Sequence, residues 1–361
     1  AGETPPLGTV AQAARRLAKA GGSLSYLPIP GLPEYTAAVQ KLMFGTGHEV
    51  VTTGRARTAQ SPGGTGALRV TADFLAQNFP HAAIWLTDPT WANHPGVFKA
   101  AGVQGEKFPY FDKQSGGLAF VEMLEALGKI PAGDAVLLHG CCHNPTGADP
   151  TINQWEQIAE VVYDRGLLPI LDFAYQGFAD GIEEDAAGLR EMARLGKEMI
   201  VCNSFSKNFG VYCERVGAVT FVAADADQAA VVESQVKRSI RANYSNPPAH
   251  GARLVAMILE DKELRSEWEG EVAAMRDRIN GMRALLVEKL AEKGVPGDYS
   301  FIQRQRGMFS FSGLTKKQVH ALRDQYAIYI VDSGRINVAG INEMNVDRLT
   351  EAIAEVVGSG Q

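Results

Sequence analysis

Two charged side chains, Asp172 and Lys207, follow apolar runs that look like buried strands. Asp172 comes directly after LPIL at residues 168–171, and Lys207 lies in NSFSKNFG, which follows MIVC at residues 199–202. Burying an ionised carboxylate or ammonium is costly unless an opposite charge or hydrogen-bonding groups pair with it. Each residue has a structural alternative, because an acid can cap a helix and a lysine can extend its ammonium to water. The presence of both residues at strand ends favours a functional site that uses a carboxylate and an amine together over two separate structural roles.

A glycine-rich turn upstream could bind an anion. Residues 61–66 read SPGGTG and precede the helical run ALRVTADFL. Free backbone N–H groups and the helix dipole attract phosphate to such a helix start; a flexible turn capped by Thr65 is the alternative. A dinucleotide site is a further alternative, since Asp88 follows the glycines by about 20 residues. That fingerprint needs GxGxxG spacing directly after a strand, and RARTAQSP is a poor strand, so we do not expect nicotinamide binding.

Together, these three features predict a phosphorylated pyridine aldehyde as the cofactor. Its phosphate would lie on the glycine turn, its ring nitrogen beside Asp172, and its aldehyde on Lys207. To react, Lys207 must lose a proton from an amine whose reference pKa is about 10.4. Burial and cationic neighbours such as Arg215 both favour that loss. Lys207 therefore follows a strand because it is the reactive group.

The elements that would position these groups alternate between apolar runs and helical stretches. This alternation predicts an α/β fold with a mostly parallel sheet covered by helices on both sides. Ligands of such sheets bind beyond the carboxyl ends of the strands, where the loops above lie. Strands are expected at residues 83–86, 135–138, 168–171, 199–202 and 218–222, and helices at residues 152–163, 186–194 and 226–240.

A long amphipathic helix leads into a smaller C-terminal part. Apolar residues recur at intervals of three and four from Trp268 to Leu290, and a glycine and a proline follow. We expect a large cofactor-binding domain over residues 5–275 and a small α+β domain over residues 276–361. In the latter, strands are expected at residues 307–311 and 329–331, and helices at residues 315–326 and 346–356.

Composition excludes several classes of function. The formal charge of −6 over 361 residues is modest and the basic residues are scattered, so neither nucleic acid nor a membrane is an expected partner. No apolar run reaches the roughly 18 residues of a membrane span, and no signal peptide is visible. The four cysteines include no CxxC pair, which favours a reducing cytoplasm. The chain opens AGETPPLG without methionine, so we expect some N-terminal sequence to be missing or disordered.

The run HGCCH at residues 139–143 offers two imidazoles and two thiols, which could be metal ligands. The preceding residues 135–138, AVLL, look like a buried strand. Packing at the end of that strand explains the run equally well. We therefore expect no metal.

Five long ungapped stretches closely resemble the class I aminotransferases, the aspartate and aromatic amino acid aminotransferases of pyridoxal-phosphate fold type I. The similarity runs nearly end to end. It implies pyridoxal 5'-phosphate as the cofactor and a homodimer with active sites shared between subunits. The stretches are HGCCHNPTGADPT (139–151), LDFAYQGFADGIEEDAAGLR (171–190), NSFSKNFGVYCERVGA (203–218), IRANYSNPPAHGA (240–252) and SGRINVAG (333–340).

The resemblance also implies which residues bind the cofactor. Lys207 would form a Schiff base, and Asp172 would pair with the pyridinium nitrogen. His94 would support Asp172, and Trp91 would stack on the ring. Polar groups would hold the remaining atoms: Asn144 and Tyr175 at the phenolic oxygen, and Gly64, Thr65, Ser204 and Arg215, with Tyr26 of a second subunit, at the phosphate.

For the substrate, the resemblance implies that Arg335 binds the α-carboxylate beside Asn144 and Trp91. Arg241 of the second subunit would bind the distal carboxylate. Guanidinium forks suit carboxylates, although structural ion pairing is the alternative. The implied reaction is a ping-pong transfer of the amino group between an L-amino acid and 2-oxoglutarate, in which Lys207 moves the Cα proton.

Substrate choice stays open at this level. YSNPP at residues 244–248 is closer to the aspartate branch, so aspartate is the expected donor. Aromatic relatives keep the same arginine and move it aside, which leaves tyrosine and phenylalanine as the alternative. Family members also carry an arm and a lid segment before the point where this chain begins. If these are absent from the molecule, we expect weaker substrate binding with the cofactor still attached.

Other classes of protein remain as alternatives. A binding protein that kept only the fold would be expected to have lost Lys207, Asp172 or Arg335, and all three are present. An oxidoreductase would bind NADH saturably. Other pyridoxal reactions remain open, because the bond that breaks is the one perpendicular to the cofactor ring.

Overall fold

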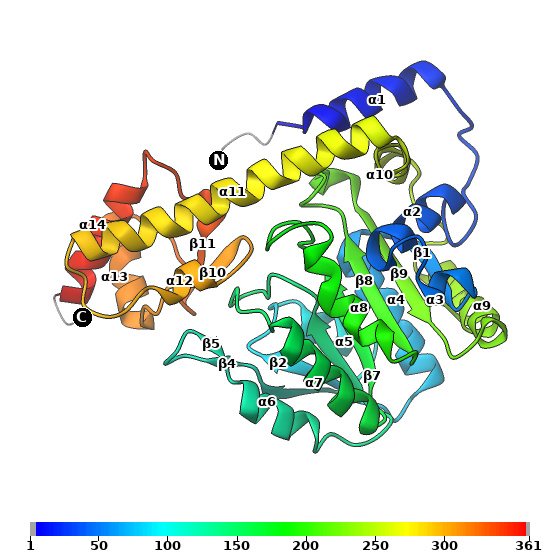
Figure 1. The fold of residues 1–361 in the computed structure, drawn as a ribbon, viewed down its shortest axis with the longest axis horizontal. Coiled ribbons are helices and arrows are strands. Elements are labelled where there is room, and N and C mark those ends of the chain that lie inside the picture. The colour runs from blue at the N-terminus through cyan, green and yellow to red at the C-terminus, as the bar shows by residue number, and fades with distance from the viewer. Residues whose placement is uncertain (1–4, 359–361) are drawn as a thin grey trace.

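The protein is described by a computed structural model covering residues 5–358, in which a seven-stranded sheet forms the centre (Figure 1). The strand order is β1-β9-β8-β7-β6-β2-β3. β9 is antiparallel to both neighbours and the other neighbouring pairs are parallel, so the expected mostly parallel sheet is confirmed. The strands are β1 Ala56–Pro62, β2 Ile84–Asp88, β3 Gly105–Pro109, β6 Ala135–His139, β7 Leu168–Phe173, β8 Met199–Ser204 and β9 Val216–Val222.

Helices cover both faces of this sheet because its strands are apolar on both faces. In β6, Val136 and Leu138 belong to one buried cluster, and Ala135 and Leu137 belong to the other. Successive side chains of a strand point to opposite faces, which explains the alternation. The helices that cover one face are α4 Gly63–Asn78, α5 His94–Ala100 and α9 Ala226–Asn243. The buried cluster on the other face includes residues of α2 Pro33–Phe44, α6 Phe120–Leu127, α7 Ile152–Asp164, α8 Ala187–Arg194 and α10 His250–Glu260.

The long helix α11, Lys262–Glu292, connects the sheet to the C-terminal region, residues 293–358 (Figure 1). The Asp261 side chain caps it by accepting the backbone N–H groups of Glu263 and Leu264. The C-terminal region mixes helices with a small antiparallel sheet, as expected. It contains α12 Phe301–Arg304, β10 Phe309–Phe311, α13 Lys316–Tyr326, β11 Arg335–Asn337 and α14 Val346–Gly358.

The first helix, α1 Gly8–Ala20, runs beside α11 (Figure 1). Its start is fixed because the backbone N–H groups of Gly8 and Thr9 donate to Glu271 Oε1 at 2.6 and 3.4 Å.

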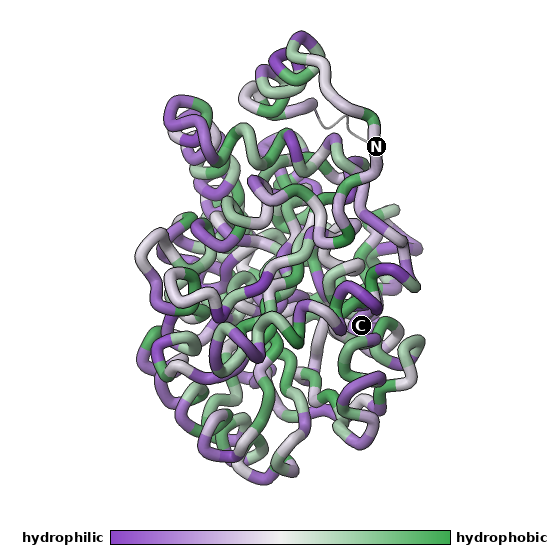
Figure 2. Tube along the Cα trace, turned by 90° about the vertical axis from the view of Figure 1, so that its right-hand side faces the viewer, coloured by the Kyte–Doolittle hydropathy of each residue, from purple (hydrophilic) through white to green (hydrophobic). Residues whose placement is uncertain are grey.

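Hydrophilic and hydrophobic stretches alternate around the outer helices (Figure 2). Of the helices within residues 5–358, none combines the length and the apolar character needed to cross a membrane. The short elements are α3 Glu49–Thr52, β4 Phe111–Asp112, β5 Gly117–Leu118, η1 Glu184–Ala186, η2 Tyr212–Glu214 and η3 Val338–Gly340.

Three expectations about elements were wrong. Residues 55–62 were expected to be a poor strand, yet Ala56–Pro62 forms β1, whose register with β9 holds a polar edge strand in place. Residues 329–331 were expected to be a strand, yet they are irregular and Tyr329 is 80% exposed; β10 pairs with Arg335–Asn337 instead. The long helix begins at Lys262 rather than near Trp268, because Asp261 provides its cap.

Candidate active site

The carboxyl ends of neighbouring strands meet at one edge of the sheet and surround a cavity of about 350 Å³. Loops after β2, β6, β7 and β8 reach it, together with the start of α4 and residues of the C-terminal region. Most of the residues predicted for the site line this one cavity. They are Gly64, Thr65, Trp91, Asn144, Asp172, Tyr175, Ser204, Lys207, Arg215 and Arg335.

Lys207 follows β8 and is half-buried in this cavity. Its Nζ lies over the ring of Tyr175, 4.6 Å from the ring centroid. Burial lowers the pKa of Lys207 below its ordinary value; the Asp172 carboxylate opposes this shift and Arg215 adds to it. The amine is therefore easier to deprotonate than one in water, as nucleophilic or base chemistry requires.

Asp172 lies near the end of β7 and is buried. Its Oδ2 accepts a hydrogen bond from Nε2 of His94, at 3.0 Å, and His94 is itself fully buried. Burial alone would raise the pKa of Asp172, but the hydrogen bond from His94 and nearby positive charge outweigh it, so the pKa lies below its usual value. The cavity therefore contains a stable anion.

A chain of hydrogen bonds extends behind His94. Nδ1 of His94 lies 2.7 Å from Thr90 Oγ1, which in turn lies 3.3 Å from Nε2 of His139. His139 Nδ1 accepts the backbone N–H of Asn144 at 3.4 Å, so the Nε2 of a neutral His139 is the donor to Thr90. Burial holds the pKa of His139 well below its ordinary value, which agrees with a neutral ring. Thr90 is then free to donate to His94, and every donor points toward Asp172.

The start of α4 forms a backbone cradle beside Arg215. Gly63 has φ +75°, and a Cβ there would lie 2.3 Å from Nη2 of Arg215. A Cβ on Gly64 would lie 2.9 Å from Cβ of Ser204, so both positions need glycine. Within the described chain, no side chain caps this helix at Pro62. The first N–H groups of α4 are therefore available to an anion.

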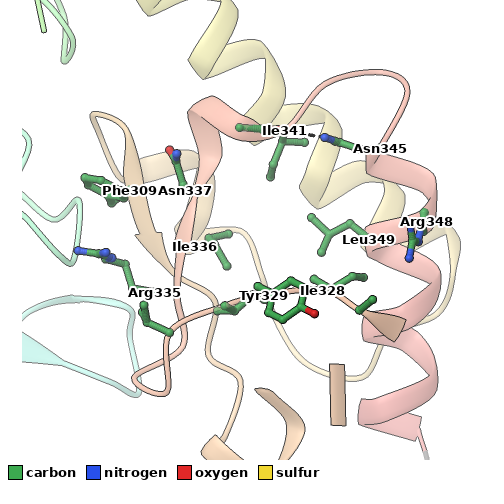
Figure 3. A pocket seen from close by; sticks show the side chains of 14 residues that line it. Phe309, Ile328, Tyr329, Arg335, Ile336, Asn337, Ile341, Asn345, Arg348 and Leu349 are labelled. Atoms are coloured by element: carbon green, nitrogen blue, oxygen red, sulfur yellow. Dashed lines mark hydrogen bonds between the residues drawn. The ribbon is translucent and has the colours of Figure 1, made fainter. Parts of the chain in front are cut away.

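Arg335, on β11, joins the C-terminal region to the sheet. Its Nη1 donates to Asn144 Oδ1 at 3.3 Å, and its guanidinium lies 4.5 Å from the ring centroid of Phe309. Asn144 Nδ2 in turn donates to the Tyr175 hydroxyl at 3.5 Å. Arg335 and Phe309 extend to the same side of the small sheet, whereas Ile336 points the other way (Figure 3). All three belong to the lining of a second cavity of about 470 Å³.

Three predicted residues do not line this cavity. His94 lies behind Asp172, as predicted, and supports it from there. The other two are on the surface. Tyr26, in the extended segment between α1 and α2, is 90% exposed. Arg241, in the last turn of α9, is exposed and donates to Ser245 Oγ at 2.7 Å. The resemblance assigns both to a neighbouring subunit's site.

The HGCCH run does not converge on one point. Among the described residues, the group that could hold an ion comprises Cys141, Cys142 and Asp185, whose candidate ligand atoms lie within 4.8 Å of one another. His143 bonds to threonine hydroxyls and stacks on Tyr110 instead. Both Asp185 oxygens already accept backbone N–H groups, so the geometry favours packing over metal binding.

Sequence reasoning missed some residues that contribute to the site. Phe309 supports Arg335, and no pattern in the sequence distinguishes it from a core residue. Thr90 links two buried imidazoles, and Ser206 accepts from Arg215 at 3.3 Å. Ser206 lies in the NSFSKNFG stretch beside Lys207, and Thr90 directly precedes Trp91, so these neighbours were the available signal.

Comparisons with known proteins agree with this geometry. The family model described as aminotransferase class I and II matches residues 1–353. The chain is 53% identical to the aspartate aminotransferase of Salmonella typhi over 99% of this chain and 90% of that protein, and 44% identical to the aromatic-amino-acid aminotransferase of Escherichia coli, with the same coverage. The crystal structure of an aromatic-amino-acid aminotransferase from Burkholderia pseudomallei, covalently bound to pyridoxal phosphate, superposes with a TM-score of 0.97 at 48% identity and covers 98% of this chain and 89% of its own. The chain therefore belongs to the class I and II aminotransferase family.

Proposed function

We propose that this aminotransferase uses pyridoxal 5'-phosphate to move an amino group from L-aspartate to 2-oxoglutarate. The observation that carries the proposal is the single cavity shared by a buried anion, a lysine of lowered pKa and an uncapped helix start beside an arginine. A pyridine aldehyde with a phosphate needs these three partners. The Burkholderia relative supports the choice, since its crystal structure contains that cofactor.

The residues present fit this cofactor. The start of α4, with Ser204 and Arg215, would hold the phosphate, because donors and positive charge converge there. Asp172 would face the ring nitrogen and Trp91 the ring, while Asn144 and Tyr175 would face the phenolic oxygen. When bound, the cofactor supplies an electron sink for the pair left behind when a substrate bond breaks.

The protein's own residues would then control charge and protons. Asp172 remains ionised, because His94 donates to it from the end of a directed hydrogen-bond chain. Lys207 would accept the substrate Cα proton and carry it to the cofactor carbon, and its lowered pKa favours the first of these roles. Arg335 would hold the substrate α-carboxylate within reach of Lys207, since both side chains line the cavity.

Replacing Arg215 with methionine tests the phosphate cradle. Hydrogen bonds to charged groups contribute about 1.5–3 kcal/mol, and Arg215 is exposed, so we expect pyridoxal phosphate to bind about tenfold more weakly. The affinity for pyridoxal, which lacks the phosphate, should not change. Absorbance titrations of both compounds measure this. Equal weakening of the two would mean that Arg215 does not contact the phosphate.

Aspartate is proposed as the donor on two grounds. Among the relatives compared by sequence, four at 48–53% identity are named aspartate aminotransferases, whereas the aromatic and tyrosine enzymes are 44% identical. Arg241 would bind the distal carboxylate of aspartate in a homodimer, with Tyr26 reaching the neighbouring phosphate. Both side chains are exposed and so are available to a second subunit. Tyrosine and phenylalanine remain the second candidates, because structural neighbours include aromatic aminotransferases.

The Arg241→Leu variant separates the two substrate classes. If Arg241 binds the distal carboxylate, kcat/KM for aspartate should fall about 10- to 150-fold, the value of one lost charged interaction. Phenylalanine has no distal carboxylate, so its kcat/KM should change less than threefold. Arg238→Leu, on the exposed side of the same helix, is the matched control. A loss shared equally by both substrates would argue against this role.

The proposal also covers the division into domains, the oligomeric state and the cellular location. The large domain would comprise residues 5–275 and the small domain residues 276–361, with the boundary inside α11. The active unit would be a homodimer, and its location cytoplasmic.

Initial-rate kinetics test the function itself. A ping-pong enzyme gives parallel double-reciprocal lines when aspartate is varied at several fixed concentrations of 2-oxoglutarate. Intersecting lines would contradict that mechanism. Saturable NADH binding would instead favour an oxidoreductase.

A further inference from the structure

A fully buried arginine lies outside the cavity and is not used by the proposed chemistry. Arg283, in α11, is 1% exposed. Within residues 5–358, none of the ion pairs involves Arg283, although guanidinium groups are rarely buried without a carboxylate. What replaces the carboxylate is a set of oxygens from one short segment, residues 302–310. The two terminal nitrogens donate to the carbonyl oxygens of Ile302 (3.0 Å), Gly307 (2.6 Å) and Phe309 (2.8 Å), and to the hydroxyl of Ser310.

These bonds fix the segment that supports Arg335. The Phe309 carbonyl bonds to Arg283, and the Phe309 ring lies 4.5 Å from the guanidinium carbon of Arg335. β10, which starts at Phe309, pairs with β11, so Phe311 lies opposite Arg335. The guanidinium of Arg283 therefore holds the strand beside Arg335 and the ring beneath it.

The same segment also docks on the loop that carries Asn144. Arg306 N donates to Gly147 O at 2.7 Å. A Cβ on Gly147 would lie 2.7 Å from the Phe309 carbonyl oxygen, and one on Gly307 would lie 2.5 Å from Cβ of Cys142. The two backbones are in direct contact, with positive φ at both glycines. Asn144 accepts the hydrogen bond from Arg335, so both ends of that contact depend on this docking.

We infer that Arg283 is a positioning residue for substrate binding, which holds residues 302–310 so that Arg335 meets the substrate carboxylate. The inference rests on the proposed function, because it assigns the substrate carboxylate to Arg335. Lysine could replace the charge of Arg283 but not its planar, forked donors. Methionine would leave the carbonyl oxygens without donors, and the segment would lose its anchor.

Binding of succinate to the cofactor-loaded protein tests this, because succinate has two carboxylates and no amino group. In Arg283→Met we expect the succinate Kd from calorimetry to rise at least about tenfold, the loss of one charged hydrogen bond. The Kd of pyridoxal phosphate should stay within about twofold, since the residues proposed for its phosphate and ring nitrogen lie outside the docked segments, and Asn144 would be its one partner there. KM for aspartate should rise while kcat at saturation changes less.

Arg55→Met is the matched control. Arg55 is 6% exposed, donates to the carbonyls of Ala223 and Gly196 and also pairs with Glu49, but it precedes β1, at the end of the strands opposite the cavity. It should lower the melting temperature without changing the succinate Kd. A succinate Kd within twofold of wild type in Arg283→Met, or equal weakening in Arg55→Met, would overturn the inference.

A second variant, Arg283→Lys, keeps the inference testable if Arg283→Met does not fold. If Arg283→Met does not fold, Arg283→Lys decides: a succinate Kd raised at least about threefold with unchanged cofactor affinity supports positioning, and a Kd within twofold rejects it. Wild-type protein that binds no pyridoxal phosphate would instead refute the proposed function, which separates the two failures.

Discussion

Replacing Lys207 with alanine should lower kcat by at least about 10⁴-fold, because the variant loses both the covalent attachment and the proton carrier. No other lysine lines the cavity formed by the described residues. Borohydride treatment of the cofactor-loaded wild type should add the mass of the reduced cofactor to the peptide containing Lys207. The variant should show no such adduct.

Lys99→Ala is the matched control for this experiment. Lys99 lies in the exposed last turn of α5, so its loss should leave both the adduct and the rate unchanged. If Lys207→Ala still forms a borohydride-stable adduct, another lysine attaches the cofactor and the site is wrongly assigned.

The Asp172→Asn variant should lower the single-turnover rate with aspartate by about 10³-fold, which corresponds to roughly 4 kcal/mol. The amide keeps the shape but cannot carry the negative charge that His94 stabilises. Because the pKa of Asp172 lies below its usual value, the wild type should not lose activity through this group until the pH falls below about 4.

A second aspartate supplies the control for this variant. Asp88 ends β2 at the same edge of the sheet, but its carboxylate is exposed and pairs with Lys107 at 3.0 Å. Asp88→Asn should keep the wild-type rate. A rate for Asp172→Asn within tenfold of wild type would show that the charge is not needed at this position.

Much of the sheet and one rim of the site could be predicted from the sequence. Parallel strands buried on both faces form continuous apolar runs, so β6, β7 and β8 are visible as such, and their carboxyl ends must share an edge. That geometry alone brings Asp172 and Lys207 to one cavity.

The other elements and site residues could not be predicted, because they depend on contacts between segments that are distant in the sequence. β1 is polar and gains its strand conformation from pairing with β9, which no local pattern encodes. Thr90 and Phe309 are uncharged, and their contribution arises only from where they lie relative to His94 and Arg335. Tyr26 and Arg241 do not line the cavity of a single chain, so their roles come from resemblance and remain proposals.

The most direct test is a half-reaction. Cofactor-loaded protein mixed with L-aspartate alone should lose its aldehyde-form absorbance and release oxaloacetate in an amount equal to the bound cofactor, without ammonia or carbon dioxide. Added 2-oxoglutarate should then restore the absorbance and yield glutamate. Unchanged absorbance with aspartate, glutamate, tyrosine and phenylalanine, or the release of ammonia, would contradict the proposed transamination.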